Sequence, residues 1–92
     1  MNIDYKTFIS KYNGDIIDIR DSYSFNKGHI PGSINLNINS ILYNVNKLSK
    51  DKIYLLVCDT SKTSLKLSKI LNSLGFNTYS LEGGYSKYVL VN

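Results

Sequence analysis

One cysteine stands where its chemistry could be used. Cys58 ends the predicted strand 52–58 and is followed by a polar loop, residues 59–64, that leads into the clearest predicted helix. Successive backbone N–H groups in a tight loop, together with the positive end of a helix, form a cradle for anions. A thiol above such a cradle is stabilised as the thiolate, which is the nucleophilic form. Position alone leaves a second interpretation equally open, in which Cys58 is an inert thiol buried at a strand end.

Strand-like and helix-like segments alternate on both sides of this loop. Short apolar or β-branched runs predict strands at residues 16–19, 33–36, 52–58 and 78–81. Helical spacing and capping residues predict helices at residues 5–12, 21–25, 63–74 and 85–91, and a further one that begins at Asn39 or Ser40 and extends to Leu48. The alternation predicts a single α/β domain over residues 1–92, with a central parallel sheet and helices on both faces. Ligands bind outside the carboxyl ends of such strands, where Cys58 lies.

The helix at 63–74 has the strongest pattern in the chain. Leu67, Ile70, Leu71 and Leu74 follow the spacing of one helix face, which predicts that this face packs on the sheet. Gly75 stands where a C-terminal cap belongs.

Composition sets the class of protein. At 92 residues, 42% hydrophobic and 20% charged, the chain is typical of one soluble globular domain. The single cysteine permits no internal disulfide, which favours a reducing, cytoplasmic setting. Residues 1–4 carry neither a basic start nor an apolar stretch, and the apolar runs are far too short to span a bilayer, so we expect no signal peptide and no membrane partner.

The net charge of +4 comes from 11 basic and 7 acidic residues, and the lysines are spread from Lys6 to Lys87. Proteins that bind nucleic acids usually cluster their positive charge and contain more arginine than this chain, so we expect no nucleic-acid partner. Attraction of small anions fits the charge better. One lone histidine, His29, and no second cysteine give no basis for a metal site, and we expect His29 to fix a turn.

Several motifs resemble the signature of the rhodanese (sulfurtransferase) family. The similar segments are Ile-Asp-Ile-Arg at 17–20, Gly-His-Ile-Pro-Gly-Ser at 28–33, Leu-Leu-Val-Cys at 55–58, Leu-Gly-Phe at 74–76 and Leu-Glu-Gly-Gly at 81–84. With the residue before the first segment and the few after the last, the resemblance extends from Ile16 to Tyr88, which is nearly the whole chain. Each match alone is weak, but the combination is specific.

The resemblance implies a rhodanese-like fold and a sulfurtransferase mechanism at Cys58. The cysteine would take sulfane sulfur from a thiosulfate-like anion, hold it as a persulfide, and pass it to cyanide, a small thiol or a sulfur-accepting protein. Backbone N–H groups of the loop would stabilise the negative charge on sulfur. The resemblance implies no cofactor and no metal.

The loop side chains are the expected substrate-binding residues: Asp59, Thr60, Ser61, Lys62, Thr63 and Ser64. Arg20, at the same sheet edge, is the one expected anion-binding side chain outside the loop, and an ordinary surface ion pair is its alternative. Phosphatases of related fold need an arginine six residues after the cysteine, and Ser64 occupies that position, which argues against phosphatase activity.

The loop also departs from the family pattern. Ser61 stands at the usual glycine, where a side chain would strain a left-handed residue by about 1–2 kcal/mol, and Thr63 stands at the usual arginine. These differences keep an alternative open, a rhodanese-fold binding or regulatory module that is weakly active or inactive as an enzyme.

Overall fold

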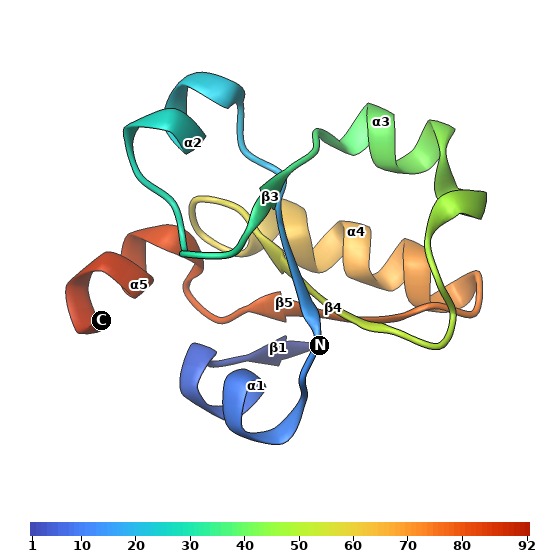
Figure 1. Ribbon diagram of the computed structural model, residues 1–92, viewed down its shortest axis with the longest axis horizontal. Helices are drawn as coiled ribbons and strands as arrows, with labels where there is room; N and C mark the ends of the chain where they lie inside the picture. The colour runs from blue at the N-terminus through green and yellow to red at the C-terminus, as the bar shows by residue number, and fades with distance from the viewer.

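A parallel sheet forms the centre of the computed structural model, which describes residues 1–92 (Figure 1). The strands lie in the order β1-β5-β4-β2-β3, and their bounds are β1 Asn2–Ile3, β2 Asp15–Asp18, β3 Ile34–Asn35, β4 Ile53–Val57 and β5 Asn77–Leu81. The helices are α1 Tyr5–Lys11, α2 Ser22–Lys27, α3 Ile38–Tyr43, a short 3₁₀ turn Val45–Lys47, α4 Lys62–Ser73 and α5 Gly84–Val91. This confirms the predicted α/β fold with a central parallel sheet.

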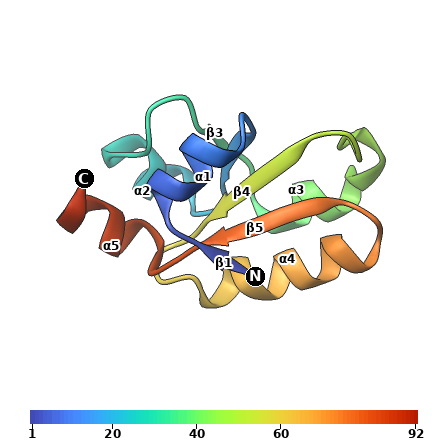
Figure 2. The same ribbon diagram turned by 90° about the horizontal axis from the view of Figure 1, so that it is seen from below.

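The alternation of side chains along β4 divides the core between the two faces of the sheet. Tyr54, Leu56 and Cys58 face one side, where they pack with residues of α3 and α4. Leu55 and Val57 face the other side, where they pack with α1, α5 and their flanking residues. Figure 2 shows α3 and α4 on one side of the sheet and α1 on the other. Cys58 therefore belongs to the α4 side.

Side-chain caps explain where three helices begin. Asp4, Asp21 and Asn37 each accept a hydrogen bond from the backbone N–H three residues on, over 2.8 Å. The caps at Asp4 and Asp21 fit the helix starts predicted at residues 5 and 21. The predicted start at Asn39 or Ser40 is wrong, because the Asn37 side chain already caps the helix two residues earlier.

The buried face of α4 differs from its hydrophobic pattern. Leu67 and Leu71 are buried as predicted, but Ile70 and Leu74 are 47% and 48% exposed. Ser64 and Ser68 take their place on the sheet, with no exposed surface. Both serines form hydrogen bonds with side chains of β5, namely Ser80 and Thr78. Hydrogen-bonded hydroxyls can be buried at low cost, so the helix is turned away from the orientation that hydrophobicity predicts.

Strand β1 was not predicted from the sequence. Only Asn2 and Ile3 form it, and they pair with Ser80 and Leu81 of β5 at the edge of the sheet. A two-residue strand has no recognisable periodicity, so only the pairing with a distant strand defines it.

Candidate active site

Two backbone N–H groups converge on the sulfur of Cys58. The loop after β4 turns back, so that the amides of Ser61 and Ser64 each donate to Sγ over 3.2 Å. Cys58 is 7% exposed, and the N-terminus of the 12-residue helix α4 begins at Lys62. Such donors favour negative charge on the sulfur, and the helix dipole adds to the effect. Two backbone donors and the start of α4 therefore surround the sulfur, which is the geometry that the predicted cradle requires.

The turn depends on an unusual backbone conformation at Ser61. Its φ of 87° and ψ of −14° are left-handed, and it is the only residue other than glycine with positive φ. This confirms the strain predicted where the family pattern has glycine. The hydroxyl of Ser61 caps nothing, whereas its carbonyl accepts from the Leu65 amide and from the Ser64 hydroxyl.

A buried pair of hydroxyls stands behind the sulfur. The Cys58 thiol donates to Oγ of Ser64 over 3.1 Å, and that oxygen lies 2.6 Å from Oγ of Ser80 on β5. Both serines are fully buried. Sequence reasoning missed Ser80, because a lone serine in a strand carries no signal until the strand is placed beside α4.

The turn between β5 and α5 holds the backbone of the nucleophile. The amides of Tyr85 and Ser86 donate to the carbonyls of Cys58 and Asp59 over 2.8 and 3.1 Å. Gly83 and Gly84 reach this position with φ of 73° and 67°. The resemblance included this glycine pair, but its contact with Cys58 was not predictable from local sequence.

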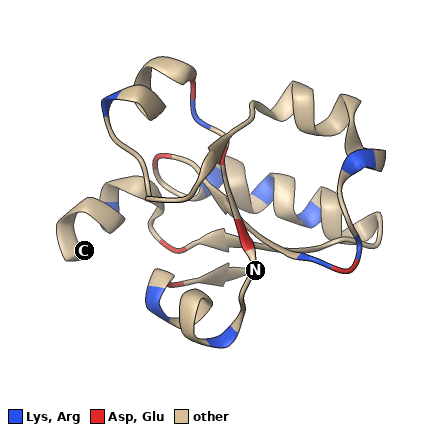
Figure 3. Cartoon of the chain, in the orientation of Figure 1, with Lys and Arg blue, Asp and Glu red and all other residues tan.

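The outer face of the loop presents polar side chains to solvent. Asp59, Thr60, Lys62 and Thr63 are exposed, and neither Asp59 nor Lys62 takes part in an ion pair. Figure 3 shows the basic residues spread over several elements, with some along α4. The loop thus offers one free cation and one free anion beside its two inward amides.

Arg20 is held inside the fold. Its guanidinium pairs with the Asp18 carboxylate at 2.7 Å, donates to the Gly28 carbonyl over 2.8 Å, and lies 4.0 Å from the centre of the Tyr85 ring. The hydrogen bonds that Arg20 donates to the Asp18 carboxylate raise the pKa of Arg20 above its ordinary value. Arg20 is only 8% exposed, so its pairing is not the surface ion pair considered above, and it forms no hydrogen bond with residues 59–64.

His29 follows the end of α2 and holds the chain there by a local contact, in keeping with the predicted structural role. Its Nδ1 lies 2.7 Å from the carbonyl oxygen of Phe25, and the two rings stack with centres 3.7 Å apart.

No group of three or more His, Cys, Asp or Glu side chains is arranged to hold a metal ion. None of the helices combines the length and apolar character needed to cross a membrane.

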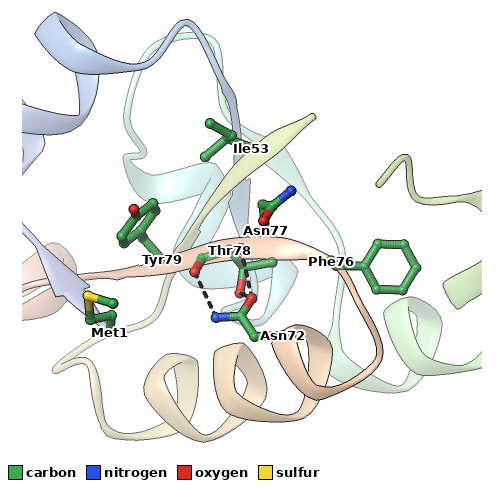
Figure 4. A pocket seen from close by; sticks show the side chains of 7 residues that line it. All are labelled: Met1, Ile53, Asn72, Phe76, Asn77, Thr78 and Tyr79. Carbon is green, nitrogen blue, oxygen red and sulfur yellow. Dashed lines mark hydrogen bonds between the residues drawn. The ribbon is translucent and has the colours of Figure 1, made fainter. Parts of the chain in front are cut away.

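A surface hollow of about 340 Å³ lies at the end of the strands opposite to Cys58, and Figure 4 shows the side chains that line it. It is lined by Met1, Ile53, Asn72, Phe76, Asn77, Thr78 and Tyr79. Ile53 and Asn77 begin β4 and β5, so the hollow is at the amino ends of the strands, whereas Cys58 follows the carboxyl end of β4. Its Asn72 amide is already bound to Thr78. The candidate site is therefore the Cys58 loop.

Comparison with known proteins agrees with the geometry. Residues 3–90 match the family model described as rhodanese-like domain. Thiosulfate sulfurtransferase GlpE of Shewanella oneidensis is 38% identical over 74 residues, which are 79% of this chain and 73% of that protein. A tRNA sulfurtransferase of Pyrobaculum aerophilum is 38% identical over 66 residues, which are 72% of this chain but only 14% of that protein.

The fold has a close counterpart among solved structures. The crystal structure of a rhodanese-related protein from Thermoplasma volcanium has a TM-score of 0.83 at 27% identity, and the match covers 98% of this chain and 89% of that one.

Proposed function

The chain belongs to the rhodanese-like domain family, and we propose that it acts as a sulfurtransferase that carries sulfur as a persulfide on Cys58. The observation that carries the proposal is the pair of amides, from Ser61 and Ser64, that point at the Cys58 sulfur. An inert buried thiol would need no such donors. Here they are oriented before any substrate arrives, which is the condition for electrostatic stabilisation of a charged sulfur.

In the first step, the Cys58 thiolate attacks the outer sulfur of a thiosulfate-like donor. A bond forms between Sγ and that sulfur, the sulfur–sulfur bond of the donor breaks, and sulfite leaves with its electron pair. In the second step, cyanide or a thiolate attacks the outer sulfur of the persulfide. The Cys58 thiolate leaves, so cyanide becomes thiocyanate or the acceptor thiolate becomes a persulfide.

The loop would serve both steps. The amides of Ser61 and Ser64 stabilise the sulfur that holds negative charge, and the exposed hydroxyls of Thr60 and Thr63 can donate to donor oxygens. Lys62 attracts an anionic donor, whereas Asp59 repels it. The chemistry uses no metal or organic cofactor.

The relatives differ in what their names say they act on. The relative from Shewanella oneidensis is named for thiosulfate, and the one from Pyrobaculum aerophilum is named for tRNA. This chain spans only a small part of the second protein. We propose a small sulfane-sulfur anion as donor and a thiol, cyanide or a sulfur-accepting protein as acceptor. A direct nucleic-acid partner is not proposed, because the basic residues are dispersed (Figure 3).

A second candidate function is a binding or regulatory module with little turnover. The left-handed serine at position 61 favours it, since the strain could distort the loop when a persulfide forms. Asp59 beside the nucleophile also opposes an anionic donor.

Intact mass spectrometry after incubation with thiosulfate distinguishes the two functions. Persulfide formation adds about 32 Da, and a reductant removes the added mass. Cys58→Ser should show no addition and no thiosulfate–cyanide activity. Absence of the adduct with several sulfane donors would favour the binding module.

A further inference from the structure

The Ser64 hydroxyl sits at the centre of three contacts. Its oxygen lies 3.1 Å from Sγ of Cys58, 3.2 Å from the Ser61 carbonyl oxygen and 2.6 Å from Oγ of Ser80. Ser80 also reaches the Ser61 carbonyl, at the longer distance of 3.4 Å. Ser64 and Ser80 lie between α4, β5 and the loop and have no exposed surface. Water therefore cannot complete the hydrogen bonds of their two hydroxyls.

The two charge states of the sulfur need opposite orientations of Ser64. With the thiol present, S–H donates to the Ser64 oxygen, and the Ser64 hydroxyl donates to the Ser61 carbonyl. The thiolate has no hydrogen, so Ser64 must turn its own hydrogen toward the sulfur. Its oxygen is then left without a donor unless the Ser80 hydroxyl supplies one over the 2.6 Å contact.

The Ser61 carbonyl tolerates this rearrangement. When Ser64 and Ser80 turn their hydrogens away, that carbonyl still accepts the Leu65 amide over 2.8 Å. The network can therefore satisfy the thiol and the thiolate without moving a heavy atom. Only the two hydroxyl hydrogens rotate, and no buried polar group is left unpaired in either state.

We propose that Ser80 is a positioning residue that turns the Ser64 hydroxyl toward Cys58 when the sulfur carries negative charge. Ser80 does not touch the sulfur and acts through Ser64. The proposal deepens the proposed function and rests on it for its biological meaning, since a negative sulfur is required in both steps of sulfur transfer. A chain of two hydroxyls also strengthens the final hydrogen bond to sulfur, because each bond polarises the next.

The same helix and strand contain a matched control pair. Ser68, one turn beyond Ser64 on α4, lies 2.7 Å from Oγ1 of Thr78 on β5, and both residues are buried. Neither is in hydrogen-bond contact with Cys58. Ser68→Ala thus removes a buried hydroxyl of the same kind from the same interface without disturbing the sulfur.

The experiment measures alkylation of Cys58 by iodoacetamide as a function of pH in the full chain, followed by intact mass. No sulfur donor is involved, so the outcome is independent of whether sulfur transfer occurs. For Ser80→Ala we expect the pH–rate profile to move to higher pH and the rate at neutral pH to fall about fivefold, the effect of one typical hydrogen bond. Ser68→Ala should leave the profile unchanged, and Ser80→Thr, which keeps a hydroxyl, should restore it.

A double variant tests that Ser80 acts through Ser64. In a Ser64→Ala background, Ser80→Ala should have no further effect on the alkylation profile. Urea denaturation of each variant establishes that it is folded. If Ser80→Ala does not fold, Ser80→Cys, which keeps the shape of the side chain but is only a weak donor, takes its place with a shift in the same direction. Equal profiles for Ser80→Ala and the parent chain, or a full effect of Ser80→Ala in the Ser64→Ala background, would overturn the proposal. A shifted profile together with failure to form a persulfide would refute sulfur transfer but leave the role of Ser80 intact.

Discussion

The carbonyl oxygen of Cys58 lies so close to Gly84 that a Cβ atom on Gly84 would stand 2.6 Å from it. The neighbouring Asp59 carbonyl oxygen would be closer still to that Cβ atom. The contact lets the next amide, that of Tyr85, bind the Cys58 carbonyl over 2.8 Å. The start of α5 thereby fixes the peptide that carries the nucleophile.

Gly84→Ala should destabilise the domain by about 2–5 kcal/mol. A φ of 67° costs an L-residue about 1–2 kcal/mol, and forcing two backbone segments apart adds about 1–3 kcal/mol. For a domain of this size the expected loss in Tm is about 10 °C or more. Thermal unfolding followed by circular dichroism measures it, and sulfur transfer should fall with it because the Cys58 peptide moves.

Gly32→Ala is the matched control. Gly32 has a similar φ of 84°, but a Cβ there would meet no atom within 4 Å. It should cost only the backbone term of about 1–2 kcal/mol and leave sulfur transfer unchanged. Equal losses of Tm in the two variants would show that the contact with Cys58 contributes nothing.

The parts of the site that were predictable from sequence are contiguous in the chain. The strand before Cys58, the loop and α4 follow one another, so the place of the cysteine at the strand end and the turn of the loop into the helix follow from local pattern. The left-handed residue at 61 was expected from the resemblance, because the family pattern has glycine there, and its positive φ is confirmed.

The parts that were not predictable depend on contacts between distant segments. Ser80 reaches Ser64 only because β5 lies beside α4, and Gly84 reaches Cys58 only because α5 starts next to the loop. The burial of Arg20 likewise depends on Tyr85, whose ring covers it. Hydrophobic periodicity misplaced the face of α4, because it does not account for hydroxyls that find partners on another element.

Ser61→Gly should stabilise the domain. It removes a left-handed strain of about 1–2 kcal/mol but adds about 0.5–1 kcal/mol of backbone entropy to the unfolded chain, so we expect a net gain of about 0.5–1 kcal/mol. Ser61→Ala keeps the Cβ and loses a hydroxyl that caps nothing, so its Tm should equal that of the parent. An equal rise in Tm for both variants would show that the hydroxyl, and not the strain, is responsible.

Arg20→Ala should be strongly destabilising. It leaves the Asp18 carboxylate, whose side chain is 1% exposed, without its charge partner, a situation that typically costs about 3–5 kcal/mol. Arg20→Lys keeps the charge but not the forked geometry, so a smaller loss is expected. Because the guanidinium is already bound inside the fold, KM for thiosulfate should be unchanged in Arg20→Lys. A raised KM in that variant would instead assign Arg20 to donor binding.

The cap of α1 should make stability depend on pH in the acid range. Hydrogen bonds from the amide and hydroxyl of Thr7 lower the pKa of Asp4 below its ordinary 3.8. A carboxylate with a lower pKa in the folded state stabilises the fold above the unfolded value, and the contribution is lost as pH falls through the folded value.

Asp4→Asn should therefore flatten part of the acid decline. Asparagine caps helices as well as aspartate but does not titrate. The urea midpoint measured from about pH 5 to about pH 2 should fall less steeply in Asp4→Asn than in the parent. Asp51→Asn, at an exposed carboxylate that accepts no hydrogen bond, should follow the parent. Parallel pH curves for Asp4→Asn and the parent would contradict the capping argument.

The two free charges of the loop should affect donor capture in opposite directions. Asp59 and Lys62 are exposed beside the nucleophile and are not paired with each other. A thiosulfate-like anion that approaches Cys58 passes both, so Asp59→Asn should raise kcat/KM and Lys62→Ala should lower it. Each charge at a surface-like dielectric is worth about 1 kcal/mol or less after screening, which corresponds to a change of about twofold to fivefold.

Ionic strength separates this effect from a structural one. The Debye length is about 30 Å at 0.01 M salt and about 3 Å at 1 M, so both effects should shrink toward the parent rate as salt is raised. Lys66→Ala, at an exposed lysine one turn further along α4, should change kcat/KM less than Lys62→Ala because it lies farther from the sulfur. If Asp59→Asn and Lys62→Ala both leave kcat/KM unchanged at low salt, side-chain charge does not select the donor. Recognition would then depend on the amides of Ser61 and Ser64 or on a partner protein that delivers the sulfur.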